Sequence, residues 1–104
     1  MSVQEKIKQQ IEANDVVLYM KGNAELPMCG FSARAVNILK TCNVKFATVD
    51  ILQDEEIRQG IKVYSNWPTI PQLYVKGEFI GGSDILAEMY EAGELQTLLK
   101  QVIA

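Results

Sequence analysis

The most reactive side chain that the sequence offers is Cys29, which stands between Pro27 and Gly30 in a segment of loop composition. An apolar run precedes this loop and helical spacing follows it, so we expect Cys29 at the start of a helix. Backbone N–H groups and the positive end of the helix dipole then point at the sulfur. Both favour the thiolate, the form that attacks disulfides and binds metal, and lower the pKa of the thiol below about 8.5. The alternative, a buried and inert cysteine, fits a loop position less well.

The residue three positions after Cys29 is Ser32, so the motif Cys-Gly-Phe-Ser holds a single thiol. A Cys-x-x-Cys enzyme resolves its mixed disulfide with its own second thiol, and this motif cannot. The other cysteine, Cys42, follows on the apolar face of the same predicted helix. It is about 20 Å away along the helix axis, which is too far for a disulfide. We expect Cys42 to pack in the core, with a resolving or intermolecular role as the alternative, and any thiol that resolves Cys29 to come from another molecule.

Composition excludes several other kinds of site. The chain has 104 residues and no histidine, which excludes Cys–His and Ser–His–Asp catalysis and histidine-ligated zinc. Two cysteines cannot complete a four-ligand metal site within one chain. The net charge of −3 argues against nucleic-acid binding, and no apolar run approaches the about 20 residues of a membrane span. The polar N-terminal segment has no apolar signal-peptide core, so we expect a cytoplasmic protein; a processed mitochondrial form stays open.

The elements that must position Cys29 follow from an apolar period that alternates between helix and strand. The length fits one domain, residues 1–104. In the helix that follows Cys29 we expect Phe31 on the apolar face, and Ser83 or Asp84 as the cap of a later helix. The expected helices are residues 3–14, 31–42, 55–64, 85–92 and 94–103, and the expected strands are residues 16–20, 45–51, 72–75 and 78–80.

The order of these elements predicts the fold. A strand–helix–strand unit requires parallel strands joined by a right-handed crossover, and the first strand is apolar throughout, as in a buried central strand. The pair Lys76-Gly77 predicts a closing antiparallel hairpin, while Pro68 and Pro71 keep the segment before it extended. An α/β fold with a mixed four-stranded sheet and helices on both faces meets all of these constraints. This is the thioredoxin-like arrangement.

Four motifs, in order along nearly the whole chain, resemble those of the monothiol glutaredoxins of the CGFS type. The motif Cys-Gly-Phe-Ser alone is weakly specific, whereas four motifs at spacings consistent with one domain are highly specific. The resemblance implies glutathione as the ligand. The motifs are Lys21-Gly22, Pro27-Met28-Cys29-Gly30-Phe31-Ser32, Trp67-Pro68-Thr69-Ile70-Pro71-Gln72 and Gly81-Gly82-Ser83-Asp84.

The resemblance also implies a role for individual residues. Lys21 and Arg58 would bind the glycine carboxylate of glutathione; taken singly, each is an ordinary solvated surface charge. Ile70 and its neighbours would pair with the cysteinyl backbone in the manner of an added strand. Pro71 corresponds to the cis-proline of the family, where an ordinary trans proline is the alternative.

At the other end of the ligand, Gly82 belongs to a turn, and the backbone N–H groups of Ser83 and Asp84 would hold the γ-glutamyl carboxylate at a helix N-terminus. The Asp84 carboxylate would accept from the ammonium group. Many relatives have cysteine where this chain has Ser83, and that cysteine can pair with the active one. Serine removes this option and leaves the backbone contact intact.

Two functions from different classes follow from the resemblance. A [2Fe–2S] cluster needs four terminal ligands, usually thiolates, so one Cys29 from each of two chains and two glutathiones would complete a homodimer bridged by the cluster. Such a protein would pass clusters to iron–sulfur client apoproteins, with a BolA-type partner replacing one subunit. The alternative is a glutathione-dependent oxidoreductase that acts on mixed disulfides through Cys29, at which the family is poor. A third hypothesis is an adaptor that binds partners through a surface around Trp67.

Overall fold

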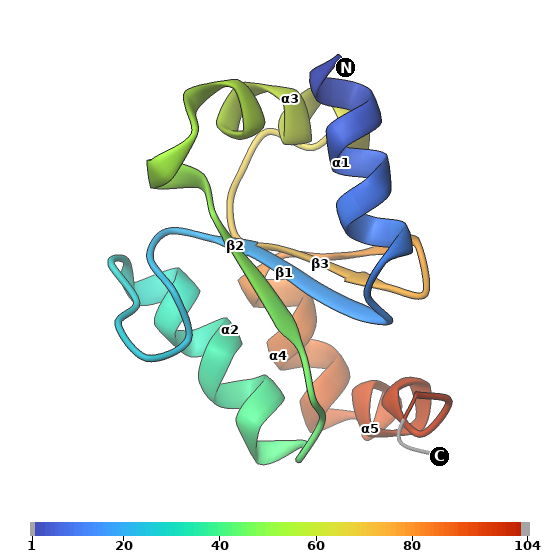
Figure 1. Cartoon of the computed structure of the whole chain (residues 1–104). Coiled ribbons are helices and arrows are strands. Elements are labelled where there is room, and N and C mark those ends of the chain that lie inside the picture. The colour runs from blue at the N-terminus through green and yellow to red at the C-terminus, as the bar shows by residue number, and fades with distance from the viewer. Residues whose placement is uncertain (1, 103–104) are drawn as a thin grey trace.

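The computed structural model describes residues 2–102, and its elements follow the predicted order (Figure 1). They are α1 (Val3–Glu12), β1 (Val16–Met20), α2 (Gly30–Thr41), β2 (Ala47–Asp50), the short 3-10 helix η1 (Ile51–Gln53), α3 (Glu55–Ser65), β3 (Gln72–Val75), β4 (Glu78–Gly81), α4 (Ser83–Glu91) and α5 (Glu94–Leu99).

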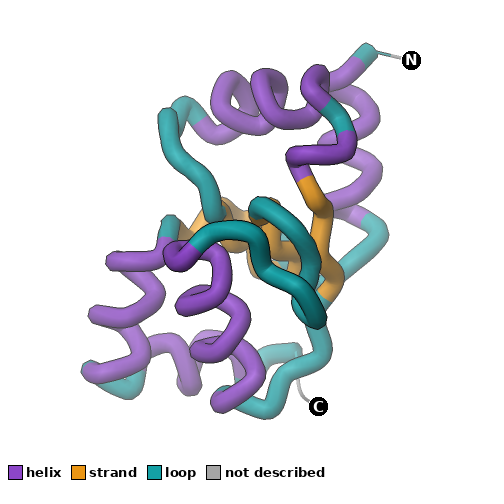
Figure 2. The backbone as a smooth tube through the Cα atoms, turned by 90° about the vertical axis from the view of Figure 1, so that its left-hand side faces the viewer, coloured by secondary structure: helices purple, strands orange, loops and turns teal. Residues whose placement is uncertain are grey.

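The strands form one mixed sheet in the order β2-β1-β3-β4. β1 pairs with β2 in parallel, while β3 pairs antiparallel with both β1 and β4. The helices lie in two groups on opposite sides of the sheet, α1 and α3 on one side and α2, α4 and α5 on the other (Figures 1 and 2). The predicted thioredoxin-like fold is confirmed.

β1 is the centre of the molecule because both of its faces are buried. All five of its residues are buried, and their side chains alternate between two apolar clusters, as the period of a strand requires. Val17 and Tyr19 pack with residues of α1 and α3, whereas Leu18 and Met20 pack with residues of α2, α4 and α5. The strand therefore ends at a fixed point between the two helical layers, and the loop before Cys29 starts there.

Two boundaries differ from the sequence prediction for local reasons. β2 ends at Asp50, because the Asp50 side chain accepts a hydrogen bond from the Leu52 N–H and starts η1. α5 ends at Leu99, because the N–H groups of residues 101 and 102 bond three residues back instead of four. The predicted helical residue Ile103 lies outside the described residues.

Two expectations about single residues are wrong. Phe31 is 61% exposed, because the buried stripe of α2 consists of Ser32, Ala35, Val36 and Leu39 and Phe31 points away from it. Neither Ser83 nor Asp84 caps α4. The N-cap is Gly82, which offers no side chain, and Ser83 is the first helical residue with its side chain buried.

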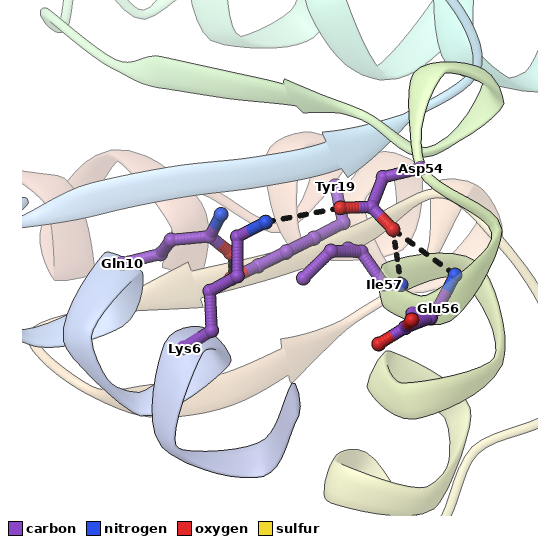
Figure 3. A network of polar contacts seen from close by, with 6 residues as sticks. All are labelled: Lys6, Gln10, Tyr19, Asp54, Glu56 and Ile57. Carbon is purple, nitrogen blue, oxygen red and sulfur yellow. Dashed lines mark hydrogen bonds and ion pairs between the residues drawn. The ribbon is translucent and has the colours of Figure 1, made fainter. Parts of the chain in front are cut away.

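Asp54 closes the N-terminus of α3 and ties this helix to α1 (Figure 3). One carboxylate oxygen accepts from the N–H groups of Glu56 and Ile57 at 3.0 and 3.2 Å, and the other lies 3.0 Å from the Lys6 Nζ. The hydrogen bond and the charge of Lys6, together with the two N–H groups, lower the pKa of Asp54 below its ordinary value. A carboxyl group whose pKa is lower in the folded state stabilises that state above its unfolded pKa.

We therefore predict that Asp54→Ala lowers the free energy of unfolding at pH 7 and that the difference from wild type shrinks as the pH falls below about 4. Asp54→Asn keeps the capping oxygen, so it should lose less stability than Asp54→Ala. Lys6→Met removes only the ion pair and is the matched control. Urea unfolding at pH 7 and pH 3 measures these differences, and a difference that is independent of pH would contradict the assignment.

Candidate functional site

Cys29 lies at the N-cap of α2, where the sequence places it, with an extended backbone and a partly exposed side chain. The pKa of its thiol is lower than the ordinary value, chiefly because the backbone N–H of Ser32 near the sulfur favours the thiolate. The N–H of Phe31, the charge of Lys21 and the Ser32 hydroxyl lower this pKa further. These are the unpaired N–H groups at the start of a helix, the expected source of thiolate stabilisation.

Ser32 is the fourth residue of the Cys-Gly-Phe-Ser motif and is completely buried. Its Oγ accepts a hydrogen bond from the Lys21 N–H at 3.1 Å. The hydroxyl therefore connects the first turn of α2 to the residue that directly follows β1, in addition to its effect on Cys29. A buried backbone N–H without such an acceptor would cost roughly 1–3 kcal/mol.

The loop of residues 21–28 is closed on itself. The Met28 N–H bonds to the Lys21 carbonyl at 2.9 Å, and the Asn23 Oδ1 accepts from the N–H groups of Glu25 and Leu26. Gly22 has a φ of +87°, and a Cβ on it would lie 2.7 Å from the Met28 nitrogen. Only glycine fits this position, and the loop places Cys29 at the N-terminus of α2.

Beside this loop lies a pocket of about 420 Å³. It collects residues from the start of the loop, from α2 and α3, from the segment before β3 and from the start of α4. All the residues predicted to bind glutathione line it except Cys29. The lining residues are Lys21, Phe31, Arg58, Lys62, Trp67, Pro68, Thr69, Ile70, Pro71, Gly82, Ser83, Asp84 and Ile85.

The charged side chains of the pocket come from different elements according to their sign. Lys21 stands at the loop, and Arg58 and Lys62 are both on α3, four residues apart. The carboxylate among the lining residues is Asp84, whose Oδ1 lies 3.2 Å from the Arg34 Nη1. Cations from two elements therefore face the pocket, and the acidic group belongs to α4.

The start of α4 presents polar groups that have no partner within the described residues. The first backbone bond of this helix runs from Leu86 to Gly82, and the Gly82 N-cap adds no side-chain bond, so the preceding N–H groups are free to bind an anion. The Ser83 side chain is 6% exposed, and its Oγ has no hydrogen-bond partner. An unpaired buried hydroxyl is rare in folded proteins, and this one belongs to a residue that lines the pocket.

The segment before β3, residues 67–71, forms a further part of the pocket wall. The Ile70–Pro71 peptide bond is cis, as the sequence resemblance implies. The Gln72 side-chain amide donates to the carbonyls of Trp67 and Thr69 at 3.2 and 3.1 Å, which fixes the segment. In residues 2–102 no hydrogen bond is found for the N–H or C=O of Ile70, so both remain available for a ligand.

Sequence reasoning missed Lys62 as a residue of the pocket and placed Phe31 on the apolar face of its helix. The position of Lys62, one helical turn after Arg58, is a signal that was available, because residues four apart share a helix face. Trp67, considered as an exposed anchor for partners, is 38% exposed, and its ring lies 5.8 Å from that of Phe79. Its indole belongs to the pocket wall.

Comparison with known proteins now assigns the chain to a family. The family model described as Glutaredoxin matches residues 16–80. The chain is 58% identical to "Glutaredoxin 4" of Haemophilus influenzae (strain 86-028NP), over 100% of this chain and 97% of that protein. The chain belongs to the glutaredoxin family. It is a monothiol member, since Ser32 replaces the second cysteine of the motif.

Solved structures agree with this assignment. The solution structure of reduced poplar apo GrxS14 superposes with a TM-score of 0.85 at 46% identity, covering 97% of this chain and 93% of that one. The crystal structure of a buckwheat glutaredoxin–glutathione complex has a TM-score of 0.84 at 22% identity, covering 95% and 88%. At that identity the likeness is one of fold.

The second cysteine, Cys42, is partly buried against the apolar cluster that α2 forms with α4 and α5. Burial raises the pKa of its thiol, which fits the packing role expected from the sequence. No helix among residues 2–102 has the length and apolar character needed to cross a membrane.

We predict that the pKa of Cys29 is lower than that of Cys42 and that Ser32→Ala raises the Cys29 pKa. The rise should be partial, because the backbone N–H groups of residues 31 and 32 remain. Thiolate absorbance at 240 nm as a function of pH measures both groups. Cys42→Ser is the control that isolates Cys29, and the low-pKa transition should persist in it. Loss of that transition in Cys42→Ser, with retention in Cys29→Ser, would contradict the assignment.

Proposed function

We propose that this glutaredoxin binds glutathione in the pocket between α3, α4 and the loop of residues 21–28, and that Cys29 and the glutathione thiol together hold a [2Fe–2S] cluster for transfer to other proteins. The observation that carries the proposal is the match between the free polar groups of the pocket and those of the tripeptide. The lining combines cations from the loop and α3, an open helix N-terminus at the start of α4 and an unpaired stretch of backbone at Ile70.

Each charged end of glutathione has protein groups of opposite charge, or hydrogen-bond donors, to bind it. Lys21 and Arg58 would bind the glycyl carboxylate, with Lys62 adding a third positive charge on the same side. The N–H groups at the start of α4 and the unpaired Ser83 hydroxyl would bind the γ-glutamyl carboxylate, and Asp84 would accept from the ammonium group. The free backbone groups of Ile70 would pair with the cysteinyl residue in the manner of an added strand.

The metal-binding side chains of one chain are too few to hold a [2Fe–2S] cluster alone, which favours a cluster shared between two chains. Among the described residues there is no group of three or more histidine, cysteine, aspartate or glutamate side chains able to hold a metal ion. Cys29 supplies one thiolate, so two chains and two glutathiones supply the four that a [2Fe–2S] cluster needs. Leu26, Met28 and Phe31 leave an exposed apolar rim around Cys29, which supports a second subunit covering this face.

The cluster is cargo in this proposal. Half of its ligands belong to a diffusible tripeptide, so release requires only that the dimer and the glutathiones separate. The homodimer would deliver to iron–sulfur client apoproteins, and a BolA-type protein would replace one subunit. Free thiols and thiolates are required throughout, so the reducing cytoplasm is the compartment that suits this role.

A second candidate function is the reduction of glutathione mixed disulfides, which the lowered pKa of Cys29 favours. The Cys29 thiolate attacks the glutathionyl sulfur of the mixed disulfide, and the client leaves as a thiolate. A second glutathione thiolate then attacks the glutathionyl sulfur of the new Cys29–glutathione disulfide, so that Cys29 leaves as a thiolate and glutathione disulfide forms. One thiol in the protein is sufficient for both steps.

We predict that anaerobic reconstitution of the wild-type glutaredoxin with iron, sulfide and reduced glutathione gives a coloured dimer. Cys29→Ser should give a colourless monomer, whereas Cys42→Ser, the matched control, should behave as wild type. Visible absorption and size-exclusion chromatography read the outcome, and omission of glutathione should abolish the colour.

A colourless wild-type monomer under these conditions would contradict the cluster proposal. Robust turnover of a glutathione mixed disulfide would then identify the oxidoreductase as the function. If neither activity appears, the adaptor hypothesis remains, for which Trp67→Ala should abolish partner binding while the protein stays folded.

A further inference from the structure

The carboxylate of Asp50 joins two parts of the structure that each lead to a cation of the pocket. Asp50 is the last residue of β2 and is the parallel partner of Met20, the last residue of β1. Its Oδ1 accepts from the Gly22 N–H at 2.9 Å and from the Leu52 N–H at 2.9 Å. One oxygen atom therefore holds both the start of the loop of residues 21–28 and the start of η1.

Each of these two amides lies close along the chain to a cation of the pocket. Gly22 follows Lys21, whose own N–H is held by the Ser32 Oγ at 3.1 Å, so two consecutive amides of this segment are fixed by side chains. Leu52 belongs to η1, which continues through the Asp54 cap into the first turn of α3, where Arg58 lies. Beside the parallel pairing of β1 with β2, a single carboxylate oxygen thus links the segments that carry Lys21 and Arg58.

The rest of the neighbourhood shows why this bond has no substitute. Gly22 is buried, so its N–H has little access to water and depends on a protein acceptor. Its φ of +87° and the close approach of Met28 prevent the segment from shifting toward the loop. Without the Asp50 carboxylate the Gly22 N–H loses its partner, and the loop keeps its bond from the Lys21 N–H to the Ser32 Oγ but loses its side-chain bond to the strand that leads to α3.

We propose that Asp50 is a positioning residue that sets the separation of Lys21 and Arg58 and so determines the affinity of the site for the terminal carboxylate of a glutathione-like tripeptide. This inference rests on the proposed function, since it assigns that carboxylate to the same two cations. Asp50 does not itself line the pocket, so its effect is exerted through the backbone.

A pair of ligands that differ only at the glycyl carboxylate separates this role from general stabilisation. Reduced glutathione carries the charge, and glutathione esterified at the glycyl carboxylate lacks it. Titration of the isotope-labelled apo protein under nitrogen, followed by NMR, gives the dissociation constant of each ligand for each variant. A variant that merely loosens the fold weakens both ligands by the same factor.

For Asp50→Ala we expect glutathione to bind about fivefold more weakly and the ester to change by less than about twofold, since only the charged contact depends on the spacing of the cations. Asp50→Asn retains a carbonyl oxygen in the same place and should stay within about twofold of wild type. Ser2→Ala also deletes the side-chain acceptor of a backbone amide, at the start of α1 outside the pocket, and should alter neither ligand. If Asp50→Ala does not fold, Asp50→Leu, which fills the same space without an acceptor, takes its place with the same expectation.

Equal weakening of both ligands, or unchanged binding of glutathione, in the alanine or leucine variant would overturn the inference while leaving glutathione binding intact. Wild-type protein that binds the ester as well as glutathione would overturn both this inference and the assignment of Lys21 and Arg58. The two failures are therefore distinguishable.

Discussion

The site depends on the anchoring of two backbone amides at the end of the central strand. The N–H of Lys21 donates to the buried Ser32 hydroxyl, and the N–H of Gly22 donates to the Asp50 carboxylate. The strand itself cannot move, since apolar clusters cover both of its faces. These contacts fix the backbone of Lys21 and the point where the loop that leads to Cys29 begins, so the reactive thiol and the ligand pocket share one reference point at the C-terminal end of β1.

The pocket is a place where the fold leaves polar groups unpaired at some cost. The N–H groups at the start of α4, the Ser83 hydroxyl and the backbone of Ile70 find no protein partner among the described residues. Each such group is unfavourable when it is buried without a hydrogen bond. They line the same pocket as the cations from the loop and α3, so one extended ligand with two carboxylates can satisfy them together. In the proposed function, the thiol in the middle of that ligand supplies the second thiolate that the Cys-Gly-Phe-Ser motif lacks.

Local signals in the sequence were sufficient for the fold, whereas the residues of the pocket were predicted from the resemblance of four ordered motifs to the monothiol glutaredoxins. The five apolar residues of β1, the proline pair before β3 and the glycine pair before α4 each specify their own conformation. The errors fall where tertiary contacts decide. The cap of α4 depends on which way the Ser83 side chain turns, and the exposure of Phe31 depends on which stripe of α2 the sheet selects. The role proposed for Asp50 was invisible for the same reason, since it bonds to Gly22, 28 residues away.

Native mass spectrometry of the anaerobically reconstituted protein tests the central claim most directly, namely that glutathione is a bound ligand that completes a site which one chain leaves incomplete. The account predicts a species whose mass equals two chains, one [2Fe–2S] cluster and two glutathiones, and which loses all of these together on dissociation. A cluster-containing species without glutathione, or one held by a single chain, would contradict it.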